Sequence, residues 1–205
     1  MFTIGEKDLG FSGVSDLVDI ELTIGNNITL IGRNSNDSPL IKVCENSTFI
    51  METGAKITGN TNTTINLNYG PNLGGGVFVS ISTGSFIMSG GIIYGNNSAG
   101  AGGGVYAMGN FTMTGGIISG NTATGGGGIY GRSISSINQG IVNFTKTGGT
   151  IYGKNEGDNS NIATNGDTYG YTVFINHGGA KYRDITTGTM DNIDSNTAEG
   201  LTPRN

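Results

Sequence analysis

The chain has 205 residues, a formal net charge of −5, 39 glycines, 3 prolines and one cysteine. Its length favours a single domain, which we predict over 1–205. The negative charge leaves no electrostatic footprint for a nucleic-acid partner, and the lone Cys44 excludes an internal disulfide. No apolar run reaches the ~18 residues that a membrane span needs. The first ten residues lack the basic and apolar regions of a secretion signal.

Alternating apolar and polar residues indicate short strands from Val18 onward, where Val18, Ile20 and Leu22 fall on one side. We predict an N-terminal edge or cap over 1–16, strand-forming coils over 17–185 and a polar C-terminal tail over 186–205. Glycine pairs interrupt every segment, and apolar residues do not recur at the helical spacing of 3.6 residues. An α-helical structure is therefore disfavoured.

Two copies of one phrase occupy 74–121: GGGVFVSISTGSFIMSGGIIYGNN and GGGVYAMGNFTMTGGIISGNT. A weaker copy precedes them, and another follows from Gly126. The phrase contains a phenylalanine in each copy, at Phe49, Phe86, Phe111 and Phe144. Unequal spacing between constant phrases places the insertions in turns, as in the coils of a solenoid.

Each copy offers three short strands, and one coil alone cannot bury its apolar face. Stacked coils pair their strands in parallel and form one continuous core. We therefore predict an all-β fold: a single-stranded right-handed parallel β-helix of about five to six coils, with three short strands per coil.

Alternation along the strands predicts which side chains form inward ladders. These ladders are Phe49/Phe86/Phe111/Phe144, Met51/Met88/Met113, Ile57/Ile93/Ile118/Ile151 and Ile41/Val77/Val105/Ile129/Val173. Asn60, Asn96 and Asn121 fall at one turn, where stacked side chains can hydrogen-bond along the stack. Lys146 takes the Met position in its copy. A buried unpaired ammonium is costly, so we expect the strand phase to slip there or the coil to open.

The phrase FTMTGGIISGNTATGGGGIY resembles the glycine-rich repeats of bacterial adhesin-like surface β-helices, related to the polymorphic outer-membrane-protein repeat. Gly103-Gly-Val105 and Gly127-Gly-Ile129 look like the Gly-Gly-Ala/Ile motif of those repeats. Their Phe-x-x-Asn motif is not kept, because Thr114 and Thr147 take the Asn position. The resemblance covers about 40–185. It implies an extracellular or outer-surface location, as part of a longer passenger or stalk, and names no ligand because the roles of the family are diverse.

The chain has no Asp or Glu between Thr53 and Asn155. The central coils therefore lack the carboxylate pair that polysaccharide hydrolysis requires and the carboxylates that bind Ca²⁺. We predict no catalytic, metal-binding or cofactor-binding residues and no cofactor. The sole histidine, His177, is read as a surface residue in a Gly-rich turn. A polysaccharide lyase or hydrolase stays as the alternative, since many such enzymes use this fold and carboxylates remain near the ends of the chain, such as Glu52, Glu156 and Asp158.

Aromatic residues recur on the outward side of the first strand in successive copies. Phe78, Tyr106, Tyr130 and Phe174 are the candidate ligand-binding residues, as an exposed stacked strip that binds a glycan or a host or matrix protein. The alternative is that the rings only stabilise the sheet. Tyr94 and Tyr152 are predicted to form a second, shorter strip. We thus expect a non-catalytic surface or secreted β-helix, serving as an adhesin or a structural stalk.

Two further readings concern the surface. Thr112/Thr114 and Thr145/Thr147 lie in register, and flat threonine arrays on β-solenoids can order ice, which makes an ice-binding solenoid a minor alternative.

Open strand edges at the ends of the stack favour edge-to-edge self-association.

Overall fold

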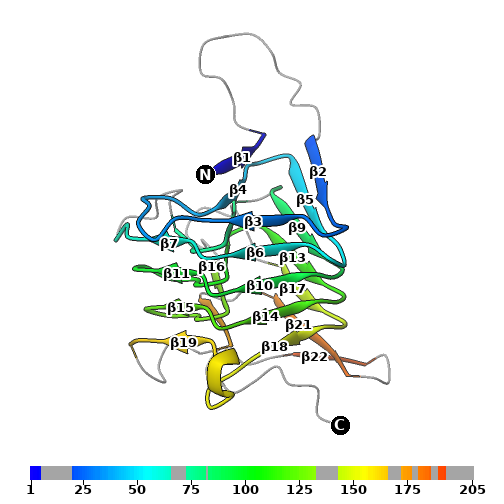
Figure 1. Cartoon of the computed structure of the whole chain (residues 1–205). Helices are drawn as coiled ribbons and strands as arrows, with labels where there is room; N and C mark the ends of the chain where they lie inside the picture. Colours follow the sequence, from blue (N-terminus) through cyan, green and yellow to red (C-terminus); the bar gives the residue numbers. More distant parts are fainter. Residues whose placement is uncertain are drawn as a thin grey trace.

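The computed structural model describes residues 1–5, 20–65, 73–81, 83–132, 143–165, 172–176, 180–185 and 189–192. Its strands stack coil upon coil from the N-terminal to the C-terminal end (Figure 1). Successive strands of each coil enter different sheets, and every strand except β22 pairs in parallel with its counterparts in the neighbouring coils. The protein is therefore an all-β parallel β-helix, as predicted.

Four sheets, named A to D here, form the walls of the stack. Sheet A contains β1 (Phe2–Ile4), β4 (Ile41–Val43), β8 (Val77–Val79), β12 (Val105–Ala107), β16 (Ile129–Arg132) and β20 (Val173–Asn176). Sheet B contains β2 (Ile20–Ile24), β5 (Ser47–Met51), β9 (Ser85–Met88), β13 (Asn110–Met113), β17 (Asn143–Lys146), β21 (Ala180–Ile185) and the antiparallel β22 (Thr189–Asn192). Sheet C contains β3 (Thr29–Ile31), β6 (Lys56–Thr58), β10 (Ile92–Tyr94), β14 (Ile117–Ser119) and β18 (Thr150–Ile151). Sheet D contains β7 (Thr61–Asn62), β11 (Asn97–Ser98), β15 (Thr122–Ala123) and β19 (Ile162–Ala163).

The coil thus has four strands, where the sequence predicted three. Sheets A, B and C are the three predicted walls. Sheet D consists of two-residue strands such as Thr61–Asn62, which are too short to show an apolar alternation. The insertion between Tyr152 and Asn161 lies in a turn, as expected, and contains the short 3₁₀ helix η2 (Gly157–Asn159), while the insertion expected up to about residue 141 lies outside the described residues.

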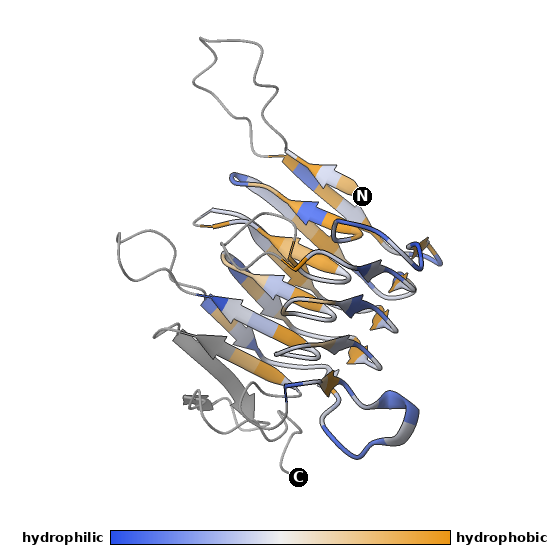
Figure 2. Cartoon of the chain, turned by 90° about the vertical axis from the view of Figure 1, so that its left-hand side faces the viewer, coloured by the Kyte–Doolittle hydropathy of each residue, from blue (hydrophilic) through white to orange (hydrophobic). Residues whose placement is uncertain are grey.

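The core lies inside the stack and consists of the predicted ladders. Phe49, Phe86, Phe111 and Phe144 stack ring on ring, with centroids 5.1, 4.8 and 5.5 Å apart. Met51, Met88 and Met113 lie beside them and Ile57, Ile93, Ile118 and Ile151 face them from sheet C, all fully buried. Figure 2 shows hydrophobic residues along the strands and a largely hydrophilic η2 loop.

Lys146 keeps the position of the Met ladder. Phe144 pairs with Phe111, and Lys146 pairs with Met113 without a break in register. The Lys146 side chain is buried. The expectation that the strand phase slips or the coil opens at Lys146 is therefore wrong.

An asparagine ladder runs along the turn between sheets C and D. Asn121 Oδ1 accepts hydrogen bonds from the backbone N–H of Asn96 at 3.0 Å and from Asn96 Nδ2 at 3.1 Å. Asn161 accepts the same pair of bonds from Asn121, and Asn60 N–H donates to Asn96 Oδ1 at 3.2 Å. The predicted stack of Asn60, Asn96 and Asn121 is confirmed, and it extends to Asn161.

Glycine triplets lie at close contacts between backbone segments of neighbouring coils. The backbone N–H of Gly103 donates to the carbonyl of Gly126 in the next coil, and Gly104 N–H donates to Gly127. A Cβ on Gly103 would lie 2.5 Å from the Gly127 carbonyl oxygen. Any larger residue would push the coils apart, which explains why the triplet opens each copy of the phrase.

Candidate functional site on sheet C

The aromatic strip of sheet A is stacked but buried. Phe78 and Tyr106 stack at 5.8 Å between centroids, Tyr106 and Tyr130 at 5.3 Å, and Phe174 lies 5.1 Å from Tyr130. The rings lie outside the main core, as alternation predicted. The exposed fractions of Phe78, Tyr106 and Tyr130 are only 3, 1 and 9 %. The expectation of an exposed strip is therefore wrong for these three residues.

The rings of this strip are covered by residues outside the strands, whose positions the apolar–polar alternation does not predict. Leu73, before the glycine triplet, and Met108, after β12, pack with the rings in a second hydrophobic cluster, and Ile81 lies against it. These residues sit in turns, whose folding over a sheet leaves no periodic signal. The geometry favours the alternative reading of the strip, in which the rings stabilise sheet A.

The outer face of sheet C, unlike the aromatic strip of sheet A, carries exposed side chains. The central residue is a fully buried Ile in β6, β10 and β14 and the half-buried Leu30 in β3, so the residues on either side of it point outward. The pairing aligns them in two columns, Thr29–Lys56–Ile92–Ile117–Thr150 and Ile31–Thr58–Tyr94–Ser119, the second continued by Tyr152. Ile92 and Tyr94 are exposed, while Ile117 and Tyr152 are half-buried.

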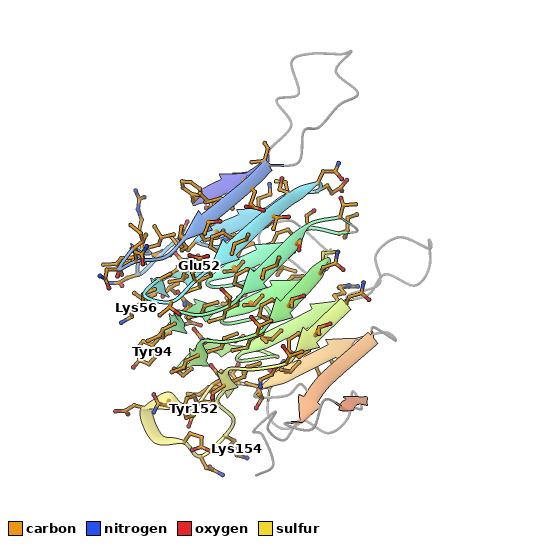
Figure 3. The ribbon with its side chains drawn as sticks, turned by 90° about the vertical axis from the view of Figure 1, so that its right-hand side faces the viewer. Glu52, Lys56, Tyr94, Tyr152 and Lys154 are labelled. Carbon is orange, nitrogen blue, oxygen red and sulfur yellow. The ribbon has the colours of Figure 1, made fainter. Side chains whose placement is uncertain are left out.

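A shallow groove of about 250 Å³ follows these columns. It is lined by Lys56, Ile92, Tyr94, Ile117, Ser119, Tyr152 and Asn159. We call this the sheet C groove. Figure 3 shows Lys56, Tyr94 and Tyr152 following one another along the edge of the stack, between Glu52 and Lys154. The groove therefore runs across the coils, along the axis of the β-helix.

The η2 loop supplies one wall of the groove. The backbone N–H of Gly120 donates to the carbonyl of Asn159 at 2.9 Å, which ties the loop to the end of β14. A Cβ on Gly120 would lie 3.1 Å from the Asp158 carbonyl oxygen. The loop can approach the sheet this closely because position 120 has no side chain.

Tyr94 is held between a cation and the backbone. Lys56 Nζ lies 5.6 Å from the centroid of the Tyr94 ring, within the range of a cation–π interaction. On Gly120, a Cβ would lie 2.5 Å from Tyr94 Cε2, so the ring rests against that glycine. Gly120 thus makes room for both the tyrosine and the loop.

Tyr152 is fixed by its backbone. Its N–H donates to the Ile118 carbonyl at 3.0 Å, and its own carbonyl accepts a bond from Asn161 Nδ2 at 2.6 Å. Asn161 is fully buried and ends the asparagine ladder within the described chain. The second tyrosine is therefore positioned by the same ladder that joins the coils.

The chemistry of the groove is that of a binding surface with hydrogen-bonding groups. Its lining offers two phenol hydroxyls, the Ser119 hydroxyl, the Asn159 amide and the Lys56 ammonium beside apolar isoleucines. None of the lining residues is Asp, Glu or His. Glu156 and Asp158 are exposed on the η2 loop but do not line the groove.

Other candidate residues are dispersed over the structure. Among the described residues, no group of three or more His, Cys, Asp or Glu is placed to hold a metal ion. His177 lies outside the described residues. Thr112 pairs with Thr145 as expected, but the coil before them has Ile87 at this position, so the described threonine rows do not extend into it.

Part of this groove follows from the sequence, which predicts Tyr94 and Tyr152 as a second aromatic strip. The other lining residues were not predicted: Lys56, Ile92, Ile117, Ser119 and Asn159. Most of these unpredicted residues lie in the third strand of a coil, where each is next to a buried Ile, so the alternation along that strand could have indicated them. Asn159 has no such signal, because it reaches the groove through an irregular loop.

Comparison with known proteins returned no match to a family model, a curated protein or a solved structure. Within the described residues, no helix has the length and apolar character to cross a membrane.

Proposed function

We propose that this protein is a non-catalytic surface or secreted β-helix that binds an extended glycan chain in the sheet C groove. The observation that carries the proposal is the placement of Tyr94 and Tyr152 in one outward column, on either side of Ser119. The β-helix acts as a rigid rod that fixes the spacing of the two rings.

The form of the groove suits a chain rather than a compact ligand. Small-molecule sites are concave and enclose most of their ligand, whereas this groove is shallow and open along the stack. A chain molecule can lie along it and extend beyond both ends. Ile31, which is 72 % exposed, continues the column toward the N-terminal end and lengthens the contact surface.

The spacing of the tyrosines suits alternate rings of a β-linked glycan. The two residues are separated by two coil repeats, which is about 9.6 Å. This is close to the length of a disaccharide unit in an extended β-linked chain. The apolar face of a sugar can then contact each tyrosine, because tyrosine offers a flat apolar body with a polar end.

Polar groups between the rings can hold the sugar hydroxyls. Asn159 is exposed in the wall of the groove, and Ser119, which is only 3 % exposed, lies on the floor between the two tyrosines. Lys56 lies at the N-terminal end of the groove, where it can meet a carboxylate or a hydroxyl of the chain. A binding role rather than hydrolysis is supported by the lining, since it contains no carboxylate to act as general acid or base.

The location at the cell surface rests on the resemblance of the glycine-rich phrase to surface β-helix repeats. A test is antibody labelling of intact cells of the source organism, with a cytosolic protein as control. Labelling only after the cells are lysed would contradict this part of the proposal.

Binding can be tested by calorimetry with cellohexaose, chitohexaose and an oligomannuronate as probes. We expect at least one probe to bind, and Tyr94→Ala and Tyr152→Ala each to weaken that binding about tenfold or more. Ile162→Ala is the matched control, because Ile162 is an exposed apolar residue of sheet D, outside the groove. Equal affinity in all variants would exclude the sheet C groove as the glycan-binding site. Shortened sugars after incubation would show turnover and favour the polysaccharide-cleaving alternative.

A further inference from the structure

Charges are segregated along the chain. All 15 acidic residues lie outside the range from Thr53 to Asn155, whereas four cationic residues lie within it: Lys56, Arg132, Lys146 and Lys154. The same range contains β6, β10, β14 and β18 of sheet C. These strands therefore carry no carboxylate on the outer face that forms the sheet C groove.

Lys56 is the charged residue of the groove lining. Its side chain is half-buried, and the strand register places it beside Ile92 in the next coil. Its ammonium reaches that coil, since Nζ lies 5.6 Å from the centroid of the Tyr94 ring. The cation is thus held next to the first of the two tyrosines.

The Lys56 ammonium has donors to offer. Among the described residues it forms no ion pair and donates no hydrogen bond, and its contact with the Tyr94 ring occupies no acceptor. Glu52, in the same coil, is directed the other way: a Cβ on Gly25, in the preceding coil, would lie 3.1 Å from Glu52 Oε2. A half-buried cation without a carboxylate partner is suited to bind an anion from outside.

The groove also has an electrostatic direction. The η2 loop carries the exposed Glu156 and Asp158, and it contacts Gly120 after β14, two coils away from Lys56. At physiological ionic strength, charges more than about 8 Å apart are largely screened. The acidic loop and the net charge of the chain therefore leave the Lys56 end of the groove open to an anion.

We propose that the sheet C groove selects anionic β-linked glycans, with Lys56 contacting a carboxylate or sulfate group at the edge of the sugar on Tyr94. This inference rests on the proposed glycan site and adds the charge of its ligand. A sugar in contact with the Tyr94 ring has its edge beside the ammonium. A charged group there accepts a hydrogen bond about twice as strong as a neutral hydroxyl accepts.

Calorimetry with three hexamers of one β-linked glucose backbone tests this preference. The probes are cellohexaose, the hexaglucuronate with a carboxylate at each C6 carbon, and cellohexaose sulfated at the same carbon. We expect the carboxylate or the sulfate hexamer to bind about tenfold tighter than cellohexaose. This preference should vanish at an ionic strength of about 1 M.

The outcomes separate this inference from the proposed glycan site. Equal affinity for the three hexamers, with Tyr94→Ala still weakening the binding of cellohexaose, would overturn the charge preference and leave the site intact. Binding of none of the hexamers would overturn both.

Variants of Lys56 test the residue itself. Lys56→Met removes the charge and keeps the aliphatic stem, so the affinity for the anionic hexamer should fall about tenfold, to that of cellohexaose. Lys56→Arg should restore the preference. Lys42→Met is the matched control, because Lys42 is a half-buried lysine of sheet A, outside the groove. If Lys56→Met weakened the binding of all three hexamers equally, Lys56 would only position the Tyr94 ring, and the proposal would be overturned.

Discussion

Asn121 Oδ1 accepts two hydrogen bonds from Asn96 in the preceding coil, one from the backbone N–H at 3.0 Å and one from Nδ2 at 3.1 Å. Asn121 Nδ2 in turn donates to the carbonyls of Ile93 and Ser119. One buried amide thus bonds to four groups of its own and the preceding coil.

Asn121→Ala should therefore destabilise the protein strongly. Buried donors and acceptors left without partners cost about 1–3 kcal/mol each, and we expect a loss of about 3–5 kcal/mol in the free energy of unfolding. Urea denaturation measures this loss. Asn97→Ala is the control, because Asn97 is exposed and should cost less than about 0.5 kcal/mol. Equal losses at the two positions would show that the ladder adds no stability.

Tyr106 should behave as a core residue. Its ring is stacked between Phe78 and Tyr130 and is 1 % exposed. Tyr106→Ala should lower the free energy of unfolding by about 3–5 kcal/mol, as for other buried aromatic residues. In contrast, Tyr94→Ala should cost about 1 kcal/mol or less because that ring is partly exposed. A loss of only about 1 kcal/mol in the free energy of unfolding of Tyr106→Ala would indicate that the aromatic strip on sheet A is exposed after all.

Gly103 should tolerate no side chain. A Cβ there would lie 2.5 Å from the Gly127 carbonyl oxygen and 2.6 Å from the Thr122 carbonyl oxygen. Gly103→Ala should cost about 3 kcal/mol or more, because backbone atoms of two neighbouring segments must move.

Gly59→Ala separates this clash from the backbone effect. Gly59 has a φ of +71°, but the nearest atom to its Cβ position is an Ile31 methyl carbon at 3.9 Å. Only the cost of the left-handed conformation remains, about 1–2 kcal/mol. Thermal melts of the two variants should therefore differ clearly, and equal midpoints would mean that coil spacing adjusts freely.

The inward half of this protein could be predicted from its sequence. Phe49, Phe86 and Phe111 recur at fixed places in one phrase, and a repeated phrase in a solenoid must stack on itself. The same logic placed Asn96 over Asn121. Inward ladders are set by register alone, so they follow once the repeat is recognised.

The outward half could not be predicted in the same way. Alternation shows that Tyr106 points away from the core, but it does not show that Leu73 and Met108 fold over the ring. Asn159 enters the sheet C groove through an irregular insertion, and Asn161 joins the asparagine ladder only after that insertion. Surfaces depend on turns, whose paths leave no periodic pattern.

Gly120 offers a test of how the groove is built. Its lack of a side chain makes room for the Tyr94 ring and for the η2 loop. Gly120→Val should displace both and weaken glycan binding about tenfold, the same direction as Tyr94→Ala. Calorimetry with the best probe measures this effect. Unchanged affinity would mean that the loop takes no part in the site.

Glycan chains are expected to lie along the sheet C groove. The most direct measurement is a titration of ¹⁵N-labelled protein with cellohexaose, chitohexaose or the oligomannuronate, following the backbone amide signals. We predict that the shifts gather at Tyr94, Ser119 and Tyr152 and vanish in the Tyr94→Ala/Tyr152→Ala double variant. Shifts confined to another face of the stack, or none with any of the three probes, would contradict the claim.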